Sequence, residues 1–297
     1  MERGFAAEAD MLGLIAAAVQ DFAGPGAVAV FEVQSAAGVP DVVATVFDQD
    51  VLDERAGVGF VTDASGVSAL LALSDAREAW QSLDAREVAA ATGLTPSYIR
   101  ARVLPGLAVR GLAVMTAPGR WTAANQYRSP ARRLVTVEAK LSDWRRGLGQ
   151  AARHAAGADE AWLVLDAVRT GAAVSRADWF RATGVGVAGL GRDGTLETLL
   201  EPDGAGILHL RARRELLAER LAELRCLGAA SGPVGKVFGR VLTSSTGADP
   251  RYPGAQDHCD WWGAYPSPSR TGPLRLPCPR RRRGQGCTLI PGVKPRP

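Results

Sequence analysis

The sequence predicts an α/β fold in which a mixed β-sheet is flanked by helices. Two β-rich runs, "AVAVFEVQ" and "VPDVVATVF", are separated by the turn-forming "SAAG", which predicts an antiparallel hairpin. Farther along, residues 132–168 read as a strand, a helix and a second strand, an order typical of a parallel crossover. A hairpin and a crossover in one chain together predict a sheet of mixed direction.

The other elements are justified by periodicity and by their end signals. A helix is expected over 6–22 because it ends at a Gly-Pro-Gly turn, and the crossover helix has Asp143 as its expected N-cap. A hairpin is expected to turn at Asp193-Gly194. In chain order, the expected elements are a helix over 6–22, strands over 27–34 and 39–47, a strand over 132–141, a helix over 143–157, a strand over 160–168, a short helix over 175–183, a hairpin over 185–202 and an amphipathic helix over 208–228.

A helical segment interrupts the strands. A first helix is expected from Ser74, and Asp84 with Glu87 predicts the start of a second. Gly93 ends that helix, and a third is expected from Thr95-Pro96 towards Leu104. Two short strands around Pro118-Gly119 follow.

This order of helix, turn, helix and hairpin resembles a winged helix-turn-helix. The resemblance implies DNA contact through a recognition helix, with a protein-docking module as the alternative. The expected DNA-binding residues are Ser97, Tyr98, Arg100 and Arg102 near that helix and Arg120 in the wing.

Charge is distributed unevenly along the 297 residues. From Thr243 onward there are nine basic and three acidic residues, so the pI of about 9.1 reflects the tail rather than the folded part. The tail is rich in proline and arginine and is expected to be disordered. No apolar run is long enough to cross a membrane, and the N-terminus does not resemble a signal peptide. A cytoplasmic protein without membrane contact is therefore expected.

Lysine is rare in this chain, yet one lysine lies inside an apolar strand. Of 35 basic residues only Lys140, Lys236 and Lys294 are lysines. On a strand, Glu138 and Lys140 point to the same face, and Asp41 of the preceding hairpin would complete a charged group with them. Two carboxylates suit Mg²⁺ or Mn²⁺, and the apolar surroundings are expected to lower the pKa of Lys140.

The runs "VPD" at 39–41 and "EAK" at 138–140 resemble the motif of the PD-(D/E)XK nuclease superfamily, which includes restriction endonucleases and Holliday-junction resolvases. The similarity covers residues 5–168 apart from the helical insertion, and it implies a restriction endonuclease-like sheet. By resemblance, Asp41 and Glu138 are metal ligands and Lys140 is the catalytic base or orienter. Glu8 matches a helix-borne metal ligand with Glu32 as its rival, and Gln150 matches a catalytic support on the following helix.

Together these features predict a Mg²⁺-dependent endodeoxyribonuclease. The alternative is a DNA-binding regulator or defence-system component whose nuclease-like domain is not catalytic. DNA is the expected partner, and a homodimer is among the states that the sequence allows. Trp144 is expected to pack, and His154 to lie on a helix surface. The expected division is a nuclease-like first part (1–73), the winged-helix insertion (74–127), a nuclease-like second part (128–208), a C-terminal helix (209–242) and the tail (243–297).

Overall fold

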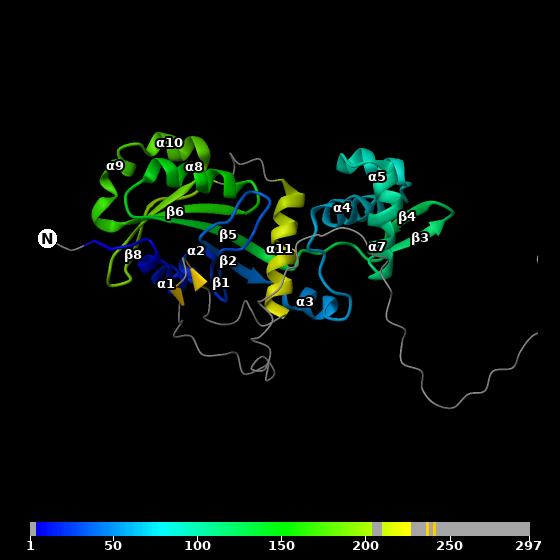
Figure 1. Ribbon diagram of the computed structural model, residues 1–297, viewed down its shortest axis with the longest axis horizontal. Helices are drawn as coiled ribbons and strands as arrows, with labels where there is room; N and C mark the ends of the chain where they lie inside the picture. Colours follow the sequence, from blue (N-terminus) through cyan, green and yellow to red (C-terminus); the bar gives the residue numbers. More distant parts are fainter. Residues whose placement is uncertain (1–3, 204–209, 227–235, 238–239, 242–297) are drawn as a thin grey trace, which may run out of the picture. The chain divides into compact units, whose positions relative to one another are not determined.

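The computed structural model describes residues 4–203, 210–226, 236–237 and 240–241 (Figure 1). The expected tail at 243–297 and the expected helix end at Gly228 lie outside the described residues. Within the described part, no helix combines the length and the apolar character needed to cross a bilayer.

Six strands form one sheet in the order β1-β2-β5-β6-β7-β8 (Figure 1). The β1–β2, β2–β5 and β7–β8 pairs are antiparallel, whereas β5, β6 and β7 are parallel. The mixed α/β sheet predicted from the hairpin and the crossover is therefore confirmed. The strands are β1 (Val28–Phe31), β2 (Val42–Phe47), β5 (Ala131–Lys140), β6 (Glu160–Asp166), β7 (Gly186–Leu190) and β8 (Leu196–Leu200).

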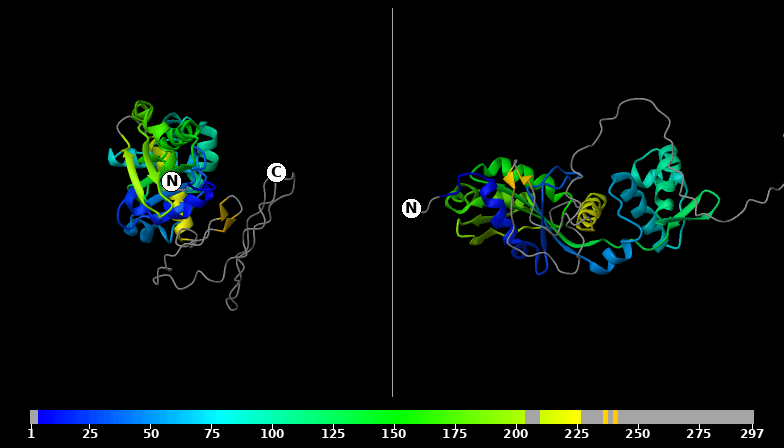
Figure 2. Two further views of the ribbon diagram at one scale, coloured as in Figure 1. Left: turned by 90° about the vertical axis from the view of Figure 1, so that its left-hand side faces the viewer. Right: turned by 60° about the horizontal axis from the view of Figure 1, so that its bottom comes forward.

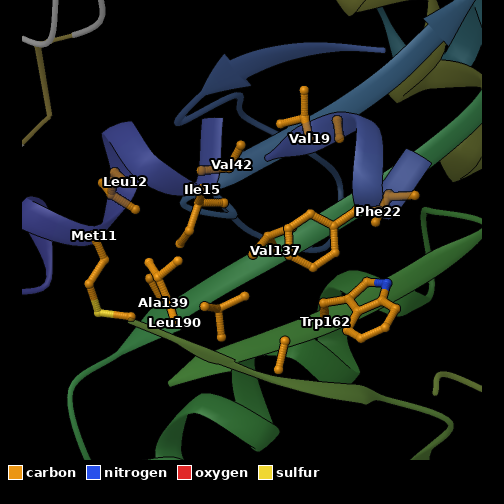
Figure 3. Close-up of a cluster of buried hydrophobic side chains, with 14 of the residues drawn as sticks. Met11, Leu12, Ile15, Val19, Phe22, Val42, Val137, Ala139, Trp162 and Leu190 are labelled. Carbon is orange, nitrogen blue, oxygen red and sulfur yellow. The ribbon is translucent and has the colours of Figure 1, made fainter. Parts of the chain in front are cut away.

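Helices cover both faces of the sheet. Alternate residues of β5 point to opposite faces, so Val137 packs under the N-terminal helices while Leu134 packs on the other side. Figure 3 shows the first of these clusters, in which α1 and α2 contribute Met11, Ile15 and Phe22. Figure 2 shows α1 and α8 on opposite sides of the strands. The helices of this part are α1 (Ala9–Ala17), α2 (Val19–Ala23), α8 (Trp144–Ala155), α9 (Gly171–Val174) and α10 (Ala177–Thr183), with a 3₁₀ turn η2 (Ala167–Arg169).

The β5–α8–β6 crossover forms as predicted. The Asp143 side chain accepts a hydrogen bond from the Arg146 N–H and caps α8. The predicted turn at Asp193-Gly194 also forms, with Gly194 at φ 87°. Because β5, β6 and β7 are parallel, their carboxyl ends meet at one edge of the sheet, where Lys140 is the last residue of β5.

The inserted segment contains the predicted helices and hairpin, with two differences. Its first helix begins at Ala64 rather than Ser74 and thus crosses the expected boundary at 73/74. The third helix includes a π-helical turn, because Pro105 has no N–H to donate one turn back. The elements are α4 (Ala64–Glu78), α5 (Ala85–Thr92), α6 (Pro96–Tyr98), the π turn η1 (Ile99–Val103), α7 (Leu104–Val109), β3 (Ala113–Ala117) and β4 (Arg120–Ala123). A helix α3 (Gln49–Arg55), which the sequence analysis did not anticipate, precedes them.

The end signals of this segment act as the sequence indicates. Asp84 and Glu87 form a complete capping box at the start of α5, and Gly93 ends that helix at φ 72°. Thr95 caps the next helix by accepting from the Tyr98 N–H. The segment has its own apolar core, to which α4, α5, α7 and β3 all contribute. The order of elements agrees with a winged helix-turn-helix, and that identification stays a prediction.

Helix α11 (Arg211–Cys226) joins the two cores. Leu216 packs into the core of the inserted segment, whereas Leu217 and Leu221 pack under the sheet. Glu215 of α11 also accepts a hydrogen bond from the Tyr127 hydroxyl at 3.0 Å. The remaining described elements, β9 (Lys236–Val237) and β10 (Arg240–Val241), pair as a short antiparallel ladder.

We expect Leu217→Ala to lower the free energy of unfolding by about 2–5 kcal/mol, because Leu217 is only 1% exposed and its removal leaves a cavity. Leu210→Ala is the matched control, since the same atoms are removed from a side chain that is 46% exposed. Its expected effect is within about 0.5 kcal/mol. Urea unfolding followed by circular dichroism measures both, and equal effects would contradict the packing described for α11.

Candidate functional site

Strand β5 carries a buried ion pair. Glu138 is 1% exposed and Lys140 7% exposed, and the Lys140 Nζ lies 2.7 Å from Glu138 Oε1. The same ammonium donates a hydrogen bond to the Ala139 carbonyl at 2.8 Å. A lysine can therefore be buried in this apolar strand because an acid two residues away neutralises it.

Asp41 lies beside this pair, as the sequence analysis predicts. In the β2–β5 ladder Val42 faces Val137, which places Asp41 next to Glu138 on the neighbouring strand. Asp41 Oδ2 accepts the Ala139 N–H at 2.8 Å and is 3.8 Å from Lys140 Nζ. The two motif halves, nearly one hundred residues apart in sequence, thus meet around one ammonium group.

Glu8 is the fourth member of the group, and Glu32 is not one. Glu8 directly precedes α1; its Oε2 lies 3.5 Å from Lys140 Nζ and its Oε1 accepts the Leu141 N–H. Glu32 is exposed, has a positive φ of 49° at the end of β1, and makes no ion pair with Lys140. We refer to Glu8, Asp41, Glu138 and Lys140 as the Lys140 cluster.

Helix α8 approaches the cluster closely through Gly147. A Cβ at this position would lie 2.9 Å from Lys140 Cγ and 2.5 Å from Leu163 Cδ1. Only a residue without a side chain lets the helix pack at this distance. The inward stripe of α8 continues from Gly147 through Gln150 to His154, at spacings of three and four residues.

His154 is a functional candidate that the sequence analysis missed. It was expected on the helix surface, but it is 4% exposed and its Nε2 lies 3.5 Å from Glu138 Oε2. The signal that could have found it is helical spacing, because His154 lies seven residues after Gly147 and three after the buried Ala151. Trp144 is buried, as predicted.

Three buried polar atoms on or beside this stripe lack a hydrogen-bond partner among the described residues. They are Glu138 Oε2, Gln150 Oε1 and His154 Nδ1. Buried polar atoms without a partner are uncommon in native proteins and often indicate a bound ion or water. Gln150, which the resemblance implies as a catalytic support, thus lies on the helix that packs against Lys140, with its oxygen free to accept a hydrogen bond.

The Lys140 cluster carries more negative than positive charge. Three carboxylates surround one ammonium, which leaves two net negative charges. Burial and the neighbouring Glu138 charge raise the pKa of Asp41 to about 6. Burial alone would raise the pKa of Glu138, but the nearby His154 imidazole and the Lys140 ammonium outweigh it and lower that pKa.

The expected low pKa of Lys140 is wrong in direction. Burial lowers this pKa and is the largest single influence, yet the hydrogen bond to Glu138 and the charges of Asp41 and Glu8 together outweigh it. The pKa of Lys140 is raised as a result, so its amine carries a proton at neutral pH.

The carboxylate oxygens of the Lys140 cluster suit a hard divalent cation, but they are not arranged as three ligands around a single ion. Within the described residues, no group of three His, Cys, Asp or Glu side chains is placed to hold a metal. Mg²⁺, however, is typically bound by one or two carboxylates together with waters and substrate phosphate. Asp41 and Glu138 fit that requirement, because Glu138 Oε2 has no hydrogen bond and the cluster lacks two positive charges.

The expected DNA-binding residues lie on the inserted segment, apart from the strands that carry the Lys140 cluster. Ser97, Tyr98, Arg100 and Arg102 are exposed, and neither of these two arginines forms an ion pair within the described residues. Arg120 is different: its guanidinium lies 2.9 Å from a Glu87 carboxylate oxygen and also donates to the Ser82 carbonyl. Its donors are thus already engaged.

We expect Gly147→Ala to destabilise the protein by about 1–3 kcal/mol, because the new methyl group overlaps Leu163 and the Lys140 side chain in a packed interior. Gly149→Ala is the matched control in the same helix, since a Cβ there has no neighbour within 4 Å. It should stabilise the helix by about 0.5–1 kcal/mol. Thermal unfolding of both variants tests this, and two stabilised variants would contradict the close approach of α8.

Comparison of the chain with protein families, with curated proteins and with solved structures finds no match to any of them. The geometry of the Lys140 cluster and of the inserted segment therefore carries the functional argument.

Proposed function

We propose that the protein is a Mg²⁺-dependent endonuclease that hydrolyses phosphodiester bonds in DNA. The observation that carries this proposal is the convergence of Glu8, Asp41 and Glu138 on Lys140 at the carboxyl edge of β5. The resemblance of "VPD" and "EAK" to the PD-(D/E)XK motif assigns the same residues to phosphodiester hydrolysis.

Each residue has a distinct role in this proposal. Asp41 and Glu138 would hold the metal, with Glu8 as an accessory ligand. When bound, Mg²⁺ or Mn²⁺ supplies Lewis-acid activation of the scissile phosphate and of the attacking water. Lys140 keeps its proton, so it orients the water and offsets the negative charge that develops on phosphate, rather than acting as the base. Gln150 supports the site through its unpaired Oε1.

The inserted segment would bring DNA to the protein. Arg100 and Arg102 lie on the helical stretch 96–109, and their exposed guanidinium groups suit phosphate contacts. Ser97 and Tyr98 occupy the amino-terminal turn of that stretch, the part of a recognition helix that reads base edges. Arg120 would stabilise the hairpin through Glu87 instead of reaching phosphate.

A second function is favoured by one feature of the same cluster. The Lys140–Glu138 pair at 2.7 Å neutralises Glu138 without a metal ion. A nuclease-like domain in a DNA-binding regulator or defence-system component would retain such a pair for stability alone. The two functions differ in whether the DNA backbone is cut.

We expect purified protein to nick supercoiled plasmid in Mg²⁺ or Mn²⁺ and not in EDTA. Lys140→Met keeps the length of the side chain but removes the charge, so nicking should fall by at least about a hundredfold. Lys140→Arg should also be poor, because a planar guanidinium does not reproduce the geometry with which the ammonium donates to Glu138 Oε1 and to the Ala139 carbonyl. Asp41→Asn should abolish nicking by weakening metal binding. Single-turnover nicking assays measure all four proteins.

Folding and DNA binding serve as controls for these variants. Lys140→Met leaves Glu138 buried without its partner, so unfolding curves must show that the assay temperature lies below the transition. DNA binding in Ca²⁺ should stay within about threefold of wild type, a free-energy change below about 1 kcal/mol. Nicking by Lys140→Met at the wild-type rate would disprove the assigned role. Tight DNA binding without nicking by wild type would instead favour the regulator.

Arg100→Ala combined with Arg102→Ala should weaken DNA binding and reduce the slope of log affinity against log salt by about 2, because two phosphate contacts are lost. The matched control is Arg192→Ala combined with Arg213→Ala, which removes two exposed charges from the sheet-bearing part, neither of them ion-paired within the described residues. Fluorescence anisotropy over a range of KCl concentrations measures both slopes. Identical slopes for the two double variants would make the inserted segment a docking module.

A further inference from the structure

Several arginines of the sheet-bearing part form ion pairs with carboxylates. Arg214 pairs with Asp159 at 2.8 Å and Arg133 pairs with Glu160. An arginine whose charge is neutralised by a carboxylate in this way attracts an anionic ligand only weakly.

The arginines of the layer formed by α8 and α10 differ from these, because they lack carboxylate partners in the part of the chain that the structure describes. Arg145 and Arg146 in the first turn of α8, and Arg176 and Arg181 at the ends of α10, are all exposed. Within the described residues none of these four forms an ion pair with a carboxylate. The helices themselves contain one acid, Asp178 of α10. The surface is therefore positive and not internally neutralised, which is the footprint of a polyanion partner.

An aromatic side chain lies among these arginines. Trp179 of α10 is 47% exposed, although the other large aromatic groups of this layer, Trp144 and Phe180, are buried. The Trp179 ring packs edge to face on Trp144, with 5.7 Å between centroids, so it is held rigidly at the surface. The Arg145 guanidinium lies 4.5 Å from the Trp144 ring centroid on the same turn.

This surface borders the Lys140 cluster. Helix α8 begins at Trp144, four residues after Lys140 leaves β5, and its second turn contacts Lys140 at Gly147. The contacts of Trp144 with Trp179 and Phe180 fix α10 against that same end of α8. Figure 1 shows α8 and α10 side by side above β6.

We propose that Arg145, Arg146, Arg176, Trp179 and Arg181, the α8–α10 surface, bind an unpaired strand of the DNA substrate. The arginines contact its phosphates, and Trp179 stacks on one of its bases. A base inside a continuous duplex has both faces covered by its neighbours, whereas an unpaired base can lie flat on an exposed indole. The exposed Trp179 ring therefore favours DNA with a single-stranded arm over continuous duplex. The proposal rests on the proposed nuclease function for the identity of the ligand.

The test compares two fluorescein-labelled DNAs, a blunt duplex and the same duplex with a single-stranded arm, by anisotropy in Ca²⁺. Wild type should bind the armed duplex more tightly. Trp179→Leu keeps apolar contact with Trp144 but has no ring to stack on, so it should lose about tenfold in affinity for the armed duplex and bind the two DNAs alike. Arg145→Ala combined with Arg146→Ala should weaken binding and lower the salt slope by about 1 to 2.

The control is again Arg192→Ala combined with Arg213→Ala, which removes the same number of exposed charges elsewhere, also unpaired among the described residues. The α8–α10 surface is not a DNA site if both test variants bind like this control. A loss with the arginine variant but not with Trp179→Leu would overturn the assignment to an unpaired strand. Nicking by the wild-type protein in Mg²⁺ separates the two proposals. If wild type prefers the armed duplex but does not nick DNA, the α8–α10 surface remains a DNA site and the nuclease proposal is wrong. If wild type nicks DNA but the surface variants bind like the control, the nuclease proposal stands and the α8–α10 surface is not a DNA site.

Discussion

The buried ion pair between Lys140 and Glu138 is the interaction on which the rest of the candidate site depends. A lysine residue that is only 7% exposed requires carboxylates around its ammonium, and Glu138, Asp41 and Glu8 supply them from β5, the residue before β2 and the residue before α1. Breaking such a pair by removing one partner typically costs about 3–5 kcal/mol, because the other charge stays buried. One side chain thereby fixes three segments that lie far apart in sequence.

The same cluster contains more negative charge than its own lysine balances. Burial and the neighbouring Glu138 charge raise the pKa of Asp41 to about 6, and Glu138 Oε2 has no hydrogen-bond donor among the described residues. A purely structural salt bridge has no need of two additional acids, since each adds repulsion to the cluster. Under the proposed function, the excess negative charge would be balanced by a divalent cation, and the unpaired arginines of α8 and α10 would contact phosphate.

Helix α11 explains how the inserted segment and the sheet form one folded body in the described chain. Successive leucines, Leu216 and Leu217, enter different cores, so one helix is buried from two sides. Arg211 of α11 pairs with Asp75 of α4, and Glu215 accepts from the Tyr127 hydroxyl. A helix that faces two cores cannot shift towards one without losing contacts in the other.

The local elements and the identity of the charged residues could be predicted from the sequence alone. Apolar runs rich in β-branched residues predicted β2, β5 and β6, and the caps at Asp84, Thr95 and Asp143 predicted where helices start, because these signals depend only on neighbours in sequence. The α/β class followed from the hairpin and the crossover.

Distances across the chain, and the balance of charge that follows from them, came only from the three-dimensional packing. The sequence placed acids around Lys140, but the direction of its pKa shift depends on whether burial or the hydrogen bond to Glu138 and the charges of Asp41 and Glu8 dominate, and the folded geometry sets that balance. The buried position of His154 depends on how α8 rotates against β5, and that rotation is set by the close approach at Gly147. The ion pair of Arg120 with Glu87 likewise forms only because the β3–β4 hairpin packs against α5. Such features arise from long-range packing, which a local pattern does not encode.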